Sequence, residues 1–122
     1  MRILVTGCAG FIGTNFALSA HNHGNEVVGL DVFSDYYDPK MKRANVGRLE
    51  QKGITMHELD LAEDVLGQRL EGIDCVVHLA GQPGISDRTP WVDYNRNNTI
   101  ATHRILEASR EAGVTRFVNI SS

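Results

Sequence analysis

The stretch that decides the fold reads ILVTGCAGFIG over residues 3–13. An aliphatic run of strand length leads into three glycines, and a helical pattern follows directly. Such a strand, turn and helix lets the backbone approach a pyrophosphate, which lies at the positive end of the helix. Glycine suits the turn because a Cβ would block either the tight turn or the phosphate. The spacing is G-x-x-G-x-x-G, since Ala9 replaces the middle glycine of the commoner G-x-G-x-x-G pattern.

An acidic residue downstream supports this interpretation. Asp31 ends a second apolar run, VVGL at residues 27–30. It stands at roughly the 20-residue separation at which a carboxylate accepts hydrogen bonds from the adenosine ribose hydroxyls of a dinucleotide. The same carboxylate would repel a 2′-phosphate, so the sequence predicts NAD as the cofactor rather than NADP. The alternative is a solvated aspartate that caps a loop.

Length and composition narrow the class of protein. The chain has 122 residues, of which 42% are hydrophobic and 22% charged, which is typical of one globular domain. Its net charge of −3 comes from interspersed acids and bases, so no nucleic-acid partner is expected. No apolar run approaches the ~20 residues that cross a membrane, and no signal-peptide pattern opens the chain, so we expect a cytoplasmic protein. Cys8 and Cys75 lack metal-ligand spacing, and no metal site is predicted.

The rest of the chain alternates predicted strands and helices. Strands are expected at residues 1–6, 26–30, 54–59, 74–79 and 115–120, and helices at 11–23 and from Pro39 to before Gly53. A short, weakly helical segment carries Leu66 and Leu70, and Thr89-Pro90 opens the longest helix, which runs toward Gly113. This alternation predicts right-handed βαβ units and an α/β, Rossmann-like, doubly wound parallel sheet. The expected strand order is 3-2-1-4-5, with a crevice between strands one and four.

The motifs together resemble a known family, the extended short-chain dehydrogenases/reductases, and among them the NAD-dependent nucleotide-sugar epimerases and dehydratases. The resemblance spans the whole chain and rests on several motifs in the same order. These are Val5-Thr6-Gly7, Gly10-Phe11-Ile12-Gly13, Asp31, Asp60-Leu61, His78-Leu79-Ala80-Gly81, Asn98 and Ser121-Ser122.

The resemblance implies a cofactor-binding set. The residue matching Asp60 binds the adenine amino group, with Leu61 beside it, while the turn 79–81 lines the nicotinamide side and Asn98 helps order the active site. The alternatives are that Asp60 caps the short helix, that the turn 79–81 merely ends a strand and that Asn98 is a solvated helix position. The full predicted set is Gly7, Gly10, Phe11, Ile12, Gly13, Asp31, Asp60, Leu61, Leu79, Ala80, Gly81 and Asn98.

A finer resemblance concerns the substrate, a UDP-sugar. The chain is similar to UDP-glucuronate 4-epimerases through DYYD at residues 35–38 with Lys42 and Arg43, and through LAGQPGI at residues 79–85. Ser86 departs from that pattern, because those epimerases usually have an arginine there that could pair with an acidic sugar. A neutral UDP-hexose epimerase of the UDP-glucose 4-epimerase type, or a related decarboxylase or dehydratase, stays open.

The catalytic groups that the resemblance implies are expected outside residues 1–122. They are a Tyr and a Lys four apart on a helix, and a Ser or Thr at position 123, just after strand five. Tyr36 and Lys40 are four apart, but Pro39 lies between them and the segment follows strand two, on the adenosine side of the crevice. We therefore expect residues 1–122 to be an incomplete NAD-binding Rossmann domain without the substrate domain. They would be inactive alone and part of an epimerase or dehydratase at full length; the alternative is a stand-alone, non-catalytic NAD or nucleotide-binding module.

The last predicted strand suggests how this chain could associate with another copy. Phe117, Val118 and Ile120 lie on a strand with no following partner in these 122 residues. An unpaired apolar edge is a template for pairing with another chain. We expect the isolated residues 1–122 to be marginally stable and to associate through this edge, and the full-length enzyme to be a homodimer.

Overall fold

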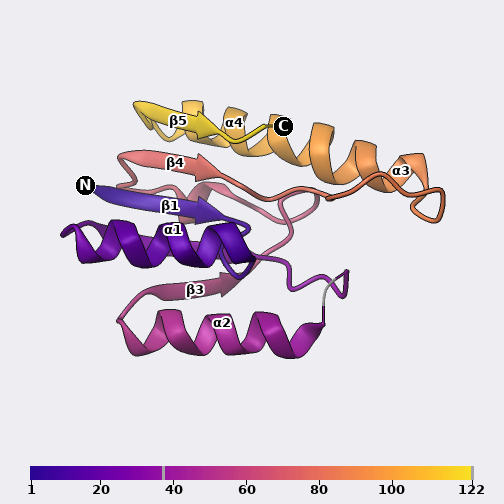
Figure 1. Ribbon diagram of the computed structural model, residues 1–122. Helices are drawn as coiled ribbons and strands as arrows, with labels where there is room; N and C mark the ends of the chain where they lie inside the picture. The colour runs from indigo at the N-terminus through magenta and orange to yellow at the C-terminus, as the bar shows by residue number, and fades with distance from the viewer. Residues whose placement is uncertain (37, 122) are drawn as a thin grey trace.

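The computed structural model describes residues 1–36 and 38–121, and its elements form a five-stranded parallel sheet in the order β3-β2-β1-β4-β5 (Figure 1). This confirms the predicted order. Tyr37 and Ser122, which take part in the sequence motifs above, lie outside the described residues. The strands are β1 (Arg2–Thr6), β2 (Glu26–Asp31), β3 (Thr55–Glu58), β4 (Cys75–His78) and β5 (Arg116–Asn119).

Both faces of the sheet are covered, as a doubly wound sheet requires. Helices α1 (Phe11–Asn22) and α2 (Pro39–Gln51) cover one face, and η1 (Gly67–Arg69) and α4 (Ala101–Glu111) cover the other (Figure 1). Strand β1 shows the alternation, because Ile3 and Val5 pack with the α1 side whereas Leu4 packs with the α4 side. Parallel strands align their carboxyl ends, so the loops after β1, β2 and β4 meet at one edge.

Two helix starts follow from local sequence. The Asp38 carboxylate accepts a hydrogen bond of 2.9 Å from the Lys40 N–H, and Pro39 occupies the first turn of α2, as predicted. Pro90 precedes the long helix in extended conformation. That helix is not uniform: it consists of α3 (Trp91–Tyr94), a π-helical segment η2 (Asn95–Ile100) and α4.

The π-helical segment was not predicted from the sequence. Its side chains make contacts with segments earlier in the chain: Arg96 donates to Asp60, and both Asn97 and Asn98 donate to Gln82. Segments of this kind often occur at functional sites.

Strand β5 forms one edge of the sheet, and its outer residues are open to solvent. Val118, on the strand, is 45% exposed, and Ile120, just after the strand, is 51% exposed. Within residues 1–36 and 38–121, no helix has the length and apolar character needed to span a membrane.

Candidate cofactor site

Two glycines of the turn after β1, Gly7 and Gly13, have no room for a side chain. Gly7 has φ of +67°, a region that favours glycine, and a Cβ there would lie 2.8 Å from the Ala80 backbone nitrogen. A Cβ at Gly13 would overlap the Gly7 carbonyl oxygen and lie 2.8 Å from the Cys8 Cα. Gly10 closes the turn by donating its N–H to that same carbonyl at 3.1 Å. The three glycines therefore allow the turn to lie directly against the start of α1 and the end of β4.

The N-terminus of α1 is open. Gly10 occupies the cap position in extended conformation, and no side chain among the described residues caps the helix. Phe11 and Ile12, in the first turn, are 82% and 62% exposed. A 12-residue helix that presents free N–H groups and a positive dipole end is suited to a diphosphate.

Asp31 lies beside this turn, at the end of β2, and its buried carboxylate accepts three hydrogen bonds. One oxygen accepts from the Ala9 N–H at 3.1 Å, and the other accepts from the Phe33 N–H at 2.8 Å and from Lys42 Nζ at 3.0 Å. A carboxylate has about four acceptor directions, so one direction is left for a ribose hydroxyl, on the oxygen that faces Ala9. Asp31 does bond the loop through the Phe33 N–H, but it is buried and is not the solvated cap that the alternative described.

Lys42 is a site residue whose role the sequence did not indicate. Its side chain is 11% exposed and that of Asp31 is 4% exposed, so the pair is largely withdrawn from water. Asn45, one turn further along α2, donates to the Ala9 carbonyl at 2.9 Å. Helix α2 is therefore fastened to the glycine turn from the side. Phe33, held by Asp31, has φ of +53°, an uncommon conformation for a non-glycine residue.

Asp60 and Leu61 follow β3 and are engaged within the protein. The Asp60 carboxylate accepts from Arg96 at 2.6 Å and from the Ala62 N–H at 2.9 Å, while the Leu61 side chain is buried in the core. Burial opposes ionisation of Asp60, but the hydrogen bonds from Arg96 and Ala62 outweigh it, so its pKa is lowered. Asp60 does not cap the short helix, as the alternative expected, because η1 begins at Gly67 with Leu66 at its cap position and no side-chain cap; the ion pair with Arg96 was not foreseen.

The turn 79–81 follows β4 and meets the long helix. Asn98 Oδ1 accepts the Gln82 N–H at 2.6 Å, and Asn98 Nδ2 donates to the Gln82 carbonyl at 3.2 Å. Asn98 is an exposed helix position, as the alternative expected, and two hydrogen bonds to Gln82 fix its side chain. The structure brings the glycine turn and residues 79–81 into contact through Gly7 and Ala80. Asp31 lies beside the glycine turn. Asp60, after β3, and Gln82, after β4, are both hydrogen-bonded to side chains of the π-helical segment.

His78 is a buried residue of this region. The sequence placed it within the motif 78–81 but indicated no role for it. Its Nδ1 lies 2.7 Å from Thr6 Oγ1 and its Nε2 lies 2.8 Å from Thr102 Oγ1, with the Phe117 ring 6.2 Å away. Burial lowers the pKa of His78 from 6.5 to about 4. The imidazole is therefore neutral at pH 7, held between two hydroxyls.

We expect this histidine to make the fold sensitive to acid. Because its pKa is lower in the folded protein than in the unfolded chain, the unfolded chain takes up the proton first as the pH falls. Stability is retained above about pH 6.5 and is lost from there to pH 4, by about 3 kcal/mol for a shift of this size. The free energies of unfolding of wild type and His78→Asn, determined in urea at pH 7 and at pH 4, measure this loss of stability. Equal losses in the two proteins would show that His78 does not carry the effect.

A hollow of about 430 Å³ lies beside the same turn. It is lined by Gly84, Ile85, Ser86, Asp87, Trp91, Tyr94, Asn98 and Thr99. The Ser86 N–H donates to the Tyr94 hydroxyl at 3.2 Å, which ties the 81–88 loop to α3. Tyr36 reaches this loop as well, because a Cβ on Gly84 would lie 2.8 Å from the Tyr36 hydroxyl. The Tyr36 side chain therefore extends beyond the adenosine side on which the sequence placed its segment.

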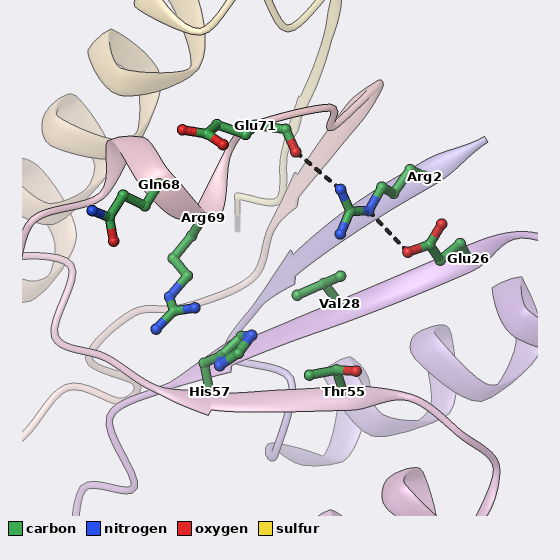
Figure 2. A pocket seen from close by; sticks show the side chains of 8 residues that line it. All are labelled: Arg2, Glu26, Val28, Thr55, His57, Gln68, Arg69 and Glu71. Atoms are coloured by element: carbon green, nitrogen blue, oxygen red, sulfur yellow. Dashed lines mark hydrogen bonds and ion pairs between the residues drawn. The ribbon is translucent and has the colours of Figure 1, made fainter.

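A second hollow, of about 240 Å³, lies between η1 and strands β1, β2 and β3 (Figure 2). There Arg2 is already engaged, donating to the Glu71 carbonyl at 3.0 Å and pairing with Glu26 at 2.9 Å. Burial, and then the charge of Arg69, lower the pKa of His57. These contacts join β1, β2 and the turn after η1, far from the glycine turn.

The thiols lie in the core. Cys8 and Cys75 are free and buried, and burial together with the Asp31 charge raises the pKa of Cys8 to about 12. Such a thiol stays protonated and unreactive. In the part of the chain that the structure describes, no group of three His, Cys, Asp or Glu side chains could hold a metal ion.

Comparison with known proteins identifies the family. Residues 3–122 match the NAD dependent epimerase/dehydratase family. The chain belongs to this family, which agrees with the expected cofactor and with the glycine turn, Asp31 and the sheet order described above.

Individual relatives point to UDP-sugar epimerases. The chain is 38% identical to UDP-glucuronate 4-epimerase 5 of Arabidopsis thaliana over 117 residues, which is 92% of this chain and 27% of the relative. It is 38% identical to the UDP-glucose 4-epimerase of Erwinia amylovora over 127 residues, 100% of this chain and 37% of the relative. The crystal structure of the UDP-glucuronic acid 4-epimerase from Bacillus cereus in complex with NAD superposes with a TM-score of 0.89 at 33% identity, covering 100% of this chain and 40% of that one. The chain thus spans well under half the length of these relatives.

Proposed function

We propose that this chain is the NAD-binding part of an epimerase that acts on a UDP-sugar. The observation that carries the proposal is the open N-terminus of α1, behind a turn with no room for a Cβ at Gly7 or Gly13, with one free acceptor direction on Asp31 beside it. Those are the two chemical requirements of a dinucleotide, a diphosphate cradle and a ribose acceptor. Membership of the family supports it.

Each part of NAD then has a group to receive it. The N–H groups at Phe11 and Ile12 would face the diphosphate, and Asp31 would accept a ribose hydroxyl. The adenine would lie toward Asp60 and Leu61. The nicotinamide would lie along residues 79–81, whose backbone is packed against the glycine turn.

In the proposed reaction, bound NAD would transiently accept a hydride from the sugar ring. The residues of this site bind and orient the cofactor; they do not transfer the proton. The family resemblance gives that task to a Tyr and Lys four apart on a helix. Tyr36 and Lys40 do not form such a pair, because Tyr36 lies in a turn and the helix begins only at Pro39.

The lining of the larger hollow bears on the sugar. Its lining residues include Asp87 and contain no lysine or arginine, and Ser86 stands at the position where an arginine would face an acidic sugar. We therefore propose an uncharged UDP-hexose in preference to a UDP-uronate. Assays of the full-length protein with UDP-glucose and UDP-glucuronate, side by side, test this. A higher kcat/KM for UDP-glucuronate would contradict it.

We expect no epimerase turnover from residues 1–122 alone. The reason is that the glycine turn, Asp31 and Asn98 bind and orient, whereas a helical Tyr-Lys pair is needed to move the proton. Turnover is measured by incubating residues 1–122 and, in parallel, the full-length protein with NAD and UDP-sugars, followed by chromatography of the sugar nucleotides. Interconversion by residues 1–122 above a heat-killed control would mean that the acid–base groups lie within this chain.

A further inference from the structure

The face of the sheet that η1 covers is left partly open over β3. Between β3 and β4 the only helical element is the short η1, whereas α1 and α2 cover the other face. Side chains alternate along a strand, so Thr55 and His57 lie on the same face as Val28 and Leu30, their neighbours on β2. This polar part of the face lines the hollow of about 240 Å³ (Figure 2).

Two nitrogen-bearing side chains converge in this hollow without a carboxylate partner. The Arg69 guanidinium extends from η1 toward the His57 ring on β3 (Figure 2). Within residues 1–36 and 38–121, the guanidinium makes no ion pair or hydrogen bond, and the His57 ring makes no hydrogen bond. Burial, and then the charge of Arg69, lower the pKa of His57. A position next to both side chains therefore favours a negative charge.

The two carboxylates that line the hollow do not supply that charge. Arg2 pairs with Glu26 at 2.9 Å, so the charge of Glu26 is offset where β1 and β2 begin. Glu71 uses its carbonyl to accept from Arg2 at 3.0 Å, and in Figure 2 its side chain points in a different direction from that of Arg69. Because Glu71 is exposed, its carboxylate would repel a bound anion only weakly, through water.

We propose that Arg69 and His57 form a binding site for a phosphate, either free or carried by a small molecule. A guanidinium presents a planar fork of donors that matches two phosphate oxygens, and the imidazole N–H adds a donor from β3. Gln68 and Thr55, which line the same hollow, bring further donors. The site shares no residue with the glycine turn, Asp31 or residues 79–81, so the inference does not depend on the proposed function.

Binding at this site is expected to strengthen as the pH falls. The charged groups that line the hollow with His57 are Arg2 from β1, Glu26 from β2, Arg69 from η1 and Glu71 from the turn after it. An anion between Arg69 and the ring favours the imidazolium, so the pKa of His57 rises when the anion binds. By linkage, protonation of His57 tightens binding of the anion.

The test is an NMR titration of the full-length protein with inorganic phosphate, at an ionic strength held constant with chloride. The His57 ring signal, assigned by its loss in His57→Gln, is expected to shift saturably with a Kd of about 1 mM. Arg69→Gln is expected to weaken binding about tenfold, the scale of a charge-assisted contact. Glu71→Gln is expected to tighten it about twofold. Arg48→Gln, at an exposed arginine in the last turn of α2, is the matched control and should leave binding unchanged.

Three further titrations separate the possible ligands. Sulfate stays doubly charged as His57 titrates, and it is expected to bind more tightly at about pH 5.5 than at about pH 7.5. Glycerol 3-phosphate distinguishes the source: tighter binding than inorganic phosphate assigns a phosphate ester, and weaker binding assigns the free ion. Phosphate titration in the presence of saturating NAD is expected to give the same Kd, because the hollow shares no residue with the glycine turn.

Three outcomes would overturn the proposal. One is the lack of a saturable His57 shift up to about 20 mM phosphate at constant ionic strength. Another is an Arg69→Gln protein that binds phosphate as tightly as Arg48→Gln. The third is displacement of phosphate by NAD, which would mean that the hollow takes the cofactor. If wild type binds phosphate here but binds no NAD, the proposed function fails and the phosphate site stands.

Discussion

Gly13→Ala is expected to unfold or severely destabilise the glycine turn and to abolish NAD binding. The added Cβ would overlap the Gly7 carbonyl oxygen and approach the Cys8 Cα at 2.8 Å, and neither backbone group can rotate away as a side chain could. Overpacking of this kind costs about 3 kcal/mol, a large share of the roughly 5–15 kcal/mol that stabilises a domain. Urea unfolding and NAD titration measure the two effects.

Gly47→Ala is the matched control. Gly47 lies within α2, where a Cβ would have nothing within 4 Å. Alanine is the better helix former, so this substitution is expected to stabilise by about 0.5–1 kcal/mol and to leave NAD affinity unchanged. A Gly13→Ala protein as stable as wild type and still binding NAD would show that the turn is not packed as described.

Asp31→Ala is expected to weaken NAD binding by about 1–3 kcal/mol, or roughly 5- to 150-fold, because a ribose hydroxyl loses a charged acceptor. It also leaves Lys42 unpaired in a site where its side chain is only 11% exposed. Breaking a largely buried pair costs about 3–5 kcal/mol of stability. The freed cation would attract a 2′-phosphate, so the ratio of NAD to NADP affinity should fall further than the loss of repulsion alone explains.

The double variant Asp31→Ala with Lys42→Met separates these effects. It removes the stranded charge, so it is expected to be more stable than Asp31→Ala and to lose the gain in NADP affinity. Glu107→Gln, which removes an exposed ion pair with Arg110, is the control and should change stability by less than about 1 kcal/mol. Unaltered NAD affinity in Asp31→Ala would contradict the ribose role.

The sheet was predictable because its signals are local. Strands β1, β2 and β4 are short apolar runs, and the glycines and Asp31 follow the strands at a spacing that the backbone geometry of one βαβ unit dictates. The helix start at Asp38 and Pro39 was predictable for the same reason: a cap and a proline act within one turn.

The missed features arise from contacts between distant segments. Nothing adjacent in sequence links Thr6 to His78, or Asp60 to Arg96, and the π-helical segment forms where such contacts converge. Lys42 belonged to a recognised motif, but its pairing with Asp31 depends on how α2 packs beside β2. The sequence also did not indicate that the Leu61 side chain is buried with Leu59 in the core, because apolar patterning alone does not show which leucines of this segment point inward.

The central claim is that the glycine turn and Asp31 form a site for NAD. Calorimetric titration of the full-length protein with NAD and with NADP, in the same buffer, tests it most directly. We expect one NAD site per chain and clearly weaker binding of NADP, because the Asp31 carboxylate repels a 2′-phosphate. No saturable NAD binding, or NADP binding as tight as NAD or tighter, would contradict it.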